Sequence, residues 1–106
     1  MGQNVLVRVI SLKPLREFWM RHRDAERPLR VWYRIVLGAE WRSLHDVRAT
    51  FPHADGVESH DGETLTVFNV GGNKYRLIAR IRYEYMLVNV RLVLTHAAYD
   101  RGDWKE

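Results

Sequence analysis

The residues best suited to binding phosphate lie in one predicted strand in the C-terminal half of the chain. Side chains of a strand alternate between its two faces, so segment 74–83 separates its basic residues from most of its apolar ones. The basic face carries Lys74, Arg76, Ile78, Arg80 and Arg82, and the other carries Tyr75, Leu77, Ala79, Ile81 and Tyr83. A positive sheet face suits the repeating charge of a nucleic acid backbone. The alternative is an arginine row that keeps an exposed face soluble and discourages edge pairing.

The next predicted strand, 87–94, brings Arg91 beside this row and leads into the segment Thr95 to Asp100. Within that segment, His96 and Tyr99 are candidates for acid–base chemistry. Histidine titrates near pH 6.5, and a tyrosine can donate a proton or stack on a base. By spacing alone, a single histidine after a strand is more often a hydrogen-bonding residue of a turn.

Other kinds of site have little support in the sequence. There is no cysteine, and the histidines 22, 45, 53 and 60 are scattered without the spacing of a metal-ligand pair. Gly71-Gly72 fits neither a dinucleotide-binding motif nor a P-loop and predicts a hairpin turn. We therefore expect neither a metal nor a cofactor.

The first half of the chain predicts one strand and three helices. The strand is 5–10, and a helical period follows over 12–22, with Ser11 as its N-cap and Pro14 in its first turn. A second helix begins near Asp24 and ends at Gly38. The run Ser43 to Asp46 resembles a capping box, so a short third helix starts there and stops before Pro52.

The second half predicts a loop followed by a meander. Segment 53–63 is the loop, and strands 65–70, 74–83 and 87–94 follow. Alternation in the last strand assigns Val88, Val90, Leu92 and Leu94 to the core face and Val93 to the opposite face. We expect Trp19, Trp32 and Trp41 in the core and Trp104 in an exposed tail. The fold class is α+β: two main helices and a short third one on one face of a small antiparallel sheet, whose basic face stays open.

Length and charge are consistent with one small, basic domain spanning residues 1–106. Of the 17 basic residues, most are arginines, whose planar fork grips phosphate, although an arginine-rich proteome would give the same excess. The net charge is +4. Segment 64–99 alone has the same net charge, with only Glu84 opposing its basic residues. No run is long enough to cross a bilayer and no signal peptide is recognisable, so we expect a cytoplasmic protein without membrane contact.

Several of these motifs, taken together, resemble those of a known family. They are F-N-V-G-G-N-K-Y-R-L-I-A at 68–79, Arg91, T-H-A-A-Y-D at 95–100, L-R-E-F-W at 15–19, D-A-E-R-P-L at 24–29 and W-Y at 32–33. In this order they resemble the HigB family of type II toxins, within the RelE-like superfamily. The resemblance covers about residues 7–100 and implies a RelE-like fold.

The resemblance also implies an activity and partners. Such toxins are ribosome-dependent mRNA endonucleases that cut messages in the decoding site and are held inactive by a HigA-type helix-turn-helix antitoxin. Operator DNA would be contacted only indirectly, through that antitoxin. Cleavage would need no metal: the 2′-hydroxyl of the RNA attacks the neighbouring phosphate, leaving a cyclic phosphate or 3′-phosphate and a free 5′-hydroxyl.

The resemblance assigns catalytic roles to four residues. Arg76 matches the strand arginine of the family and would stabilise charge on the phosphate in the transition state, with Arg91 as a second candidate. His96 would act as general acid or base. Tyr99 would stack on an mRNA base or assist proton transfer, and which of the two is acid and which base stays open.

Four further residues would contact RNA. Asn73 and Lys74, at the turn into the arginine strand, would position the backbone, and Arg80 and Arg82 add charge to the strand. Two alternatives remain. One is an RNA- or protein-binding member of the superfold that has lost its chemistry, and the other is the gyrase-poisoning branch. Retention of Arg76, His96 and Tyr99 favours the nuclease over both.

Overall fold

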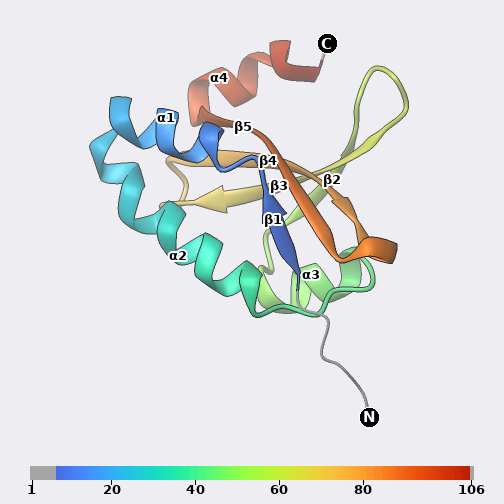
Figure 1. The fold of residues 1–106 in the computed structure, drawn as a ribbon. Helices are drawn as coiled ribbons and strands as arrows, with labels where there is room; N and C mark the ends of the chain where they lie inside the picture. The colour runs from blue at the N-terminus through green and yellow to red at the C-terminus, as the bar shows by residue number, and fades with distance from the viewer. Residues whose placement is uncertain (1–6, 106) are drawn as a thin grey trace.

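The computed structural model describes residues 7–105, which form an α+β fold around a five-stranded mixed sheet (Figure 1). The strands are β1 (Arg8–Ile10), β2 (Asp55–Glu58), β3 (Thr64–Val70), β4 (Tyr75–Arg82) and β5 (Leu87–Thr95), in the order β1-β5-β4-β3-β2. The helices are α1 (Lys13–Arg21), α2 (Glu26–Leu37), α3 (Leu44–Thr50) and α4 (His96–Arg101). Short 3₁₀ turns cover Arg23–Ala25, Tyr83–Tyr85 and Asp103–Lys105.

The strands and helices that the sequence predicts are present, with corrections at the two edges of the sheet. The predicted antiparallel sheet is wrong for β1, which pairs in parallel with β5. The predicted loop 53–63 is wrong in part, because Asp55–Glu58 forms β2 and pairs with β3. Residues 5 and 6 of the predicted first strand lie outside the described residues. Within the described range, no helix has the length and apolar character needed to cross a membrane.

The helices end near the predicted residues, but their N-terminal capping differs from the prediction. Gly38 ends α2 and Ser43 precedes α3, as predicted. Ser11 does not cap α1: its φ is +65° and Leu12 occupies the N-cap position. The predicted capping box is wrong in detail: the Ser43 side chain makes no capping hydrogen bond, and the Asp46 carboxylate accepts one from the backbone N–H of Arg42, 2.8 Å away.

The main core lies between the sheet and the layer of α1 and α2. Its buried residues include Trp32 and Trp41, as predicted, whereas Trp19 is only partly buried against this core. The predicted core face of β4 is confirmed, since Tyr75, Leu77 and Ala79 belong to this cluster.

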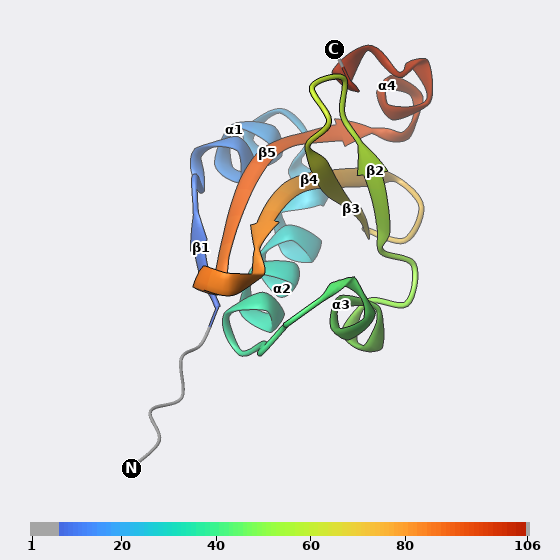
Figure 2. The ribbon, with the colours of Figure 1, turned by 90° about the vertical axis from the view of Figure 1, so that its right-hand side faces the viewer.

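The opposite face of the sheet is not fully open, which corrects the prediction of helices on one face only. A second apolar cluster there contains Leu65, Val67 and Ile78, with Tyr99 and Trp104 packed against it. The C-terminal segment, α4 and the turn after it, therefore covers part of this face, and Figure 2 shows it across the sheet from α1 and α2. Trp104 is thus half-buried rather than part of an exposed tail.

A β-bulge changes which side chains of β5 face the main core. Ile78 pairs with Leu92 while Ala79 pairs with Val90, so Arg91 is an extra residue between them. One extra residue reverses the alternation that follows. Leu92 consequently packs in the second cluster and Val93 is buried in the main core, opposite to the prediction. Leu94 moves to the second cluster for the same reason.

Candidate active site

The segment that carries His96 and Tyr99 forms a helix, α4, which the sequence did not predict. Thr95 caps it, because its side-chain oxygen accepts a hydrogen bond from the N–H of Ala98 at 3.2 Å. Gly102 ends it at φ +79°, a left-handed conformation that glycine adopts without a steric penalty. The backbone N–H of His96 donates to the carbonyl of Lys74 at 2.9 Å, which ties the start of α4 to the start of β4.

Arg76 is held in a fixed position on β4. One of its terminal nitrogens donates to the Asn73 side-chain oxygen at 3.1 Å, and the other donates to the carbonyls of Tyr75 at 3.1 Å and Asn73 at 3.3 Å. Its side chain shares a face with the second apolar cluster, and only 8% of the residue is exposed. A guanidinium shielded from bulk water interacts more strongly with an anion. Three hydrogen bonds leave two of its five N–H groups for a ligand.

Tyr99 lies directly beside Arg76. The guanidinium carbon is 5.5 Å from the centre of the Tyr99 ring, within cation–π range. Trp104 stacks on the same ring at 5.1 Å and 17°, and its indole N–H donates to the Tyr99 carbonyl at 2.9 Å. Burial raises the pKa of the Tyr99 hydroxyl, and the charges of Asp55 and Asp100 raise it further against the opposing charge of Arg76. The hydroxyl is therefore protonated at neutral pH.

His96 is paired with an acid that the sequence analysis gave no role. Its Nδ1 lies 3.1 Å from a carboxylate oxygen of Asp100, one helical turn later. An ionised carboxylate only accepts hydrogen bonds, so Nδ1 carries a proton and Nε2 has the free lone pair in the neutral ring. The signal was the four-residue spacing of His96 and Asp100, which brings two side chains together only on a helix, and no helix was predicted there.

Lys74 is directed to another part of the molecule. Its ammonium is 2.5 Å from a carboxylate oxygen of Asp24, in the turn between α1 and α2, and Tyr75 donates to the second oxygen at 2.5 Å. These two hydrogen bonds lower the pKa of Asp24, and the bond to Asp24 raises the pKa of Lys74. The charge of Lys74 is therefore neutralised by Asp24. Asn73, its neighbour, serves Arg76 instead.

The charges of Arg80 and Arg91 are also partly neutralised, by one acidic residue. Glu63 accepts from Arg80 at 3.0 Å and from Arg91 at 2.7 Å, and its side chain is only 16% exposed. Glu84 is the only acid within residues 64–99, but Glu63, which lies just before β3, reaches the row from outside that segment. Arg82, at the end of β4, is exposed.

The predicted site residues therefore fall into two groups. Arg76, Asn73 and Tyr99 lie together, with His96 one turn before Tyr99 on α4. Arg80 and Arg91 form a separate group around Glu63. Within residues 7–105, no three His, Asp or Glu side chains gather as they would around a metal ion.

Comparison with known proteins finds similar chains. The family model of HigB toxins, described as the RelE-like toxic component of a toxin–antitoxin system, matches residues 25–102. The match includes every residue of the two groups above. An mRNA interferase HigB of Escherichia coli O6:H1 is 27% identical over 93 residues, which are 88% of this chain and 88% of that protein.

Two further relatives match over a shorter segment. The mRNA interferase toxin HigB of Escherichia coli K12 is 35% identical over 60 residues, covering 57% of this chain and 56% of its own length. An mRNA interferase HigB of Shigella flexneri gives the same identity and coverage.

Proposed function

Because the chain belongs to the HigB family of toxins from toxin–antitoxin systems, we propose that it is an endoribonuclease that cleaves translated mRNA on the ribosome. The names of its relatives, mRNA interferases, support RNA cleavage. In a bacterium, this cleavage inhibits translation and stops growth, and the protein acts in the cytoplasm.

The observation that carries the proposal is the position of the Arg76 guanidinium, 5.5 Å from the Tyr99 ring. A nuclease that uses the 2′-hydroxyl of RNA as nucleophile needs a base, an acid and a cation around one phosphate. The imidazole of His96, the hydroxyl of Tyr99 and the guanidinium of Arg76 supply these three groups. Two of them are on α4 and the third is on β4, which α4 covers.

In the proposed reaction, Nε2 of His96 takes the proton of the 2′-hydroxyl, and the 2′-oxygen bonds to the adjacent phosphorus. The bond from phosphorus to the 5′-oxygen then breaks, and the Tyr99 hydroxyl gives its proton to that oxygen. Arg76 stabilises the extra negative charge on the phosphate. The products are a cyclic phosphate, which water opens to a 3′-phosphate, and a free 5′-hydroxyl. No step uses a metal or a cofactor.

The position of Tyr99 beside Arg76 supports its role as the acid, because a tyrosine hydroxyl there can donate a proton close to the guanidinium. The contact between His96 and Asp100 supports the role of His96 as the base, since it leaves Nε2 free. A stacking role for Tyr99 on an mRNA base is less favoured, because Trp104 already stacks on its ring.

The remaining basic residues would hold the RNA backbone. Arg82 is exposed and available for a phosphate. Arg80 and Arg91 would bind phosphate in competition with Glu63, so Arg91 is better suited to the backbone than to the scissile phosphate. Lys74 would have to leave Asp24 to reach RNA.

A HigA-type helix-turn-helix antitoxin is the proposed partner, and operator DNA would be contacted through it alone. Ribosome dependence can be tested directly. Purified toxin is incubated with a defined mRNA, with or without programmed ribosomes, and the 5′ ends are mapped. We expect cleavage only with ribosomes, at 5′-hydroxyl ends, and loss of cleavage in Arg76→Ala and His96→Ala. Growth arrest by the wild type without any mRNA cleavage would contradict the proposal and favour a binding protein without chemistry.

A further inference from the structure

The outer surface of α1 and α2 combines exposed apolar residues with arginine. Val31 and Ile35, on α2, are 44% and 41% exposed, and Met20 on α1 is more exposed still. Between Lys13 and Arg34 there are seven basic and three acidic residues. One of those acids, Asp24, is already paired with Lys74. The surface is therefore basic as well as apolar, although Glu26 offsets Arg30 at 2.8 Å.

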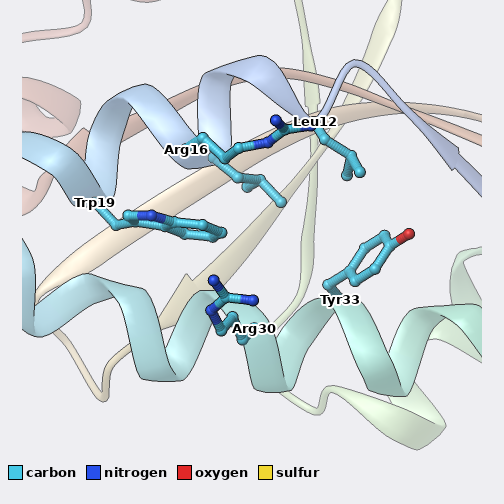
Figure 3. A pocket seen from close by; sticks show the side chains of 6 residues that line it. Leu12, Arg16, Trp19, Arg30 and Tyr33 are labelled. Carbon is cyan, nitrogen blue, oxygen red and sulfur yellow. The ribbon is translucent and has the colours of Figure 1, made fainter.

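Three hollows lie around the exposed surface of α2. The first, about 170 Å³, lies between α1 and α2, where Arg16, Trp19, Arg30 and Tyr33 point into it (Figure 3). The guanidinium of Arg30 lies over the Trp19 ring at 4.7 Å. The second hollow shares Arg30 with the first and is lined by four arginines of this region. The third lies on the other flank of α2, beside Phe51 and residues 69–72, and shares Arg27 and Val31 with the second. These second and third hollows, which adjoin at Arg27 and Val31, are called the trough below.

This composition favours a protein ligand over a nucleic acid. An RNA backbone needs cations and gains nothing from exposed aliphatic side chains, whereas protein interfaces are enriched in arginine, methionine and aromatic residues. A trough beside a helix accepts an amphipathic segment, with its apolar side chains against the trough. The surrounding arginines require that the other side chains of that segment be acidic.

We propose that the trough along α2 binds an acidic, amphipathic segment of the antitoxin. The proposal rests on the assignment of the chain as a toxin with an antitoxin partner, and it adds the surface and the chemistry of the contact. The third hollow ends at Gly71 and Gly72, the turn just before Asn73. A segment that fills the trough therefore reaches the turn that supports Arg76, while α4 lies on the opposite side of the sheet.

The test measures binding of the product of the gene adjacent to that of the toxin, by titration calorimetry on purified proteins. Val31→Asp places a charge in the trough, and Arg34→Glu reverses one at its rim. Tyr85→Asp and Arg42→Glu make the same changes at exposed positions elsewhere. We expect at least tenfold weaker binding in each trough variant, as for central interface residues, and no change in the controls. Circular dichroism and the melting temperature verify that each variant is folded.

Ribosomal mRNA cleavage by the same variants distinguishes this inference from the proposed function. We expect Val31→Asp and Arg34→Glu to cleave mRNA as the wild type does, and to escape inhibition by the antitoxin. Loss of binding in a chain that never cleaves RNA would support the trough and contradict the nuclease. Wild-type affinity in both folded trough variants would overturn the proposal, as would a wild-type toxin that does not bind the adjacent gene product. Weaker ribosome binding with unchanged antitoxin binding would assign the surface to RNA instead.

Discussion

The guanidinium of Arg76 lies 5.5 Å from the centre of the Tyr99 ring, and this contact joins the strand β4 to the helix α4. Arg76 is anchored from the other side by Asn73, and Tyr99 is anchored by Trp104. The candidate active site is therefore a junction between two elements rather than a pocket in one of them. Each anchor can be removed separately, which gives the first two predictions.

Replacement of Asn73 should reduce cleavage without unfolding the protein. In Asn73→Ala, Arg76 loses the side-chain acceptor at 3.1 Å and keeps only two backbone carbonyl acceptors, so its guanidinium is held less firmly. We expect about a tenfold lower single-turnover rate, because small misplacements of a charged group are costly in catalysis. Asn89→Ala, in the adjacent strand, is the control and should keep the wild-type rate. Equal rates in the two variants would show that the anchor is not needed.

Replacement of Trp104 should loosen α4. Trp104→Ala removes the ring that stacks on Tyr99 and the N–H that binds its carbonyl. We expect a loss of about 1–3 kcal/mol in the free energy of unfolding, as for other partly buried aromatic residues, together with slower cleavage. Tyr85→Ala, an exposed aromatic elsewhere, should change neither. Thermal denaturation and single-turnover kinetics measure both effects, and an unchanged melting temperature would refute the anchoring role.

The carboxylate of Asp100 should matter through His96. Asp100→Asn weakens the acceptor that orients the imidazole at Nδ1. We expect cleavage to fall about tenfold, and about 10²–10⁴-fold in His96→Ala, the range for loss of a general base. Because Asp100 acts by positioning, the pH–rate profile of Asp100→Asn should be displaced, whereas Asp103→Asn should retain the wild-type profile. A lower rate with an unchanged profile would argue for a purely structural role.

Removal of Glu63 should strengthen binding of RNA. Glu63→Gln releases Arg80 and Arg91 from their shared carboxylate, so two more cations can neutralise phosphates. Affinity for single-stranded RNA should rise, and its dependence on salt should become steeper, by up to two phosphate contacts. Glu58→Gln, on the neighbouring strand β2, changes net charge by the same amount. If both variants gain affinity equally, net charge and not the released arginines is responsible.

Asp24 should give the fold a dependence on acid pH. Its pKa is lowered in the folded state by hydrogen bonds from Lys74 and Tyr75. A carboxyl group with a lowered pKa stabilises the fold above its unfolded value of 3.8, and that contribution is lost as the pH falls through the lower folded value. Asp24→Asn should therefore melt below the wild type at pH 7. The difference should shrink below pH 3.8, and a difference that is constant down to pH 2 would contradict this assignment.

The sequence was most informative where the structure is locally regular. Alternation along β4 correctly separated Leu77 and Ala79 from Arg76, because pairing between strands preserves the two faces. The same rule failed at Leu92, because a bulge at Arg91 reverses the faces and no local pattern marks the extra residue. The helix that begins at His96 was not predicted, since six residues are too few for a helical period to be recognised.

Sequence motifs alone were sufficient to identify the family and to single out Arg76, His96 and Tyr99. Only the tertiary structure showed which basic side chains are already paired with acidic ones. Lys74 is matched by Asp24, fifty residues earlier, and Arg91 by Glu63, twenty-eight residues earlier. Residue types and spacing depend on local backbone geometry and are visible in the chain. Ion pairs between distant residues depend on how the sheet and helices bring those residues together, and no local pattern encodes that.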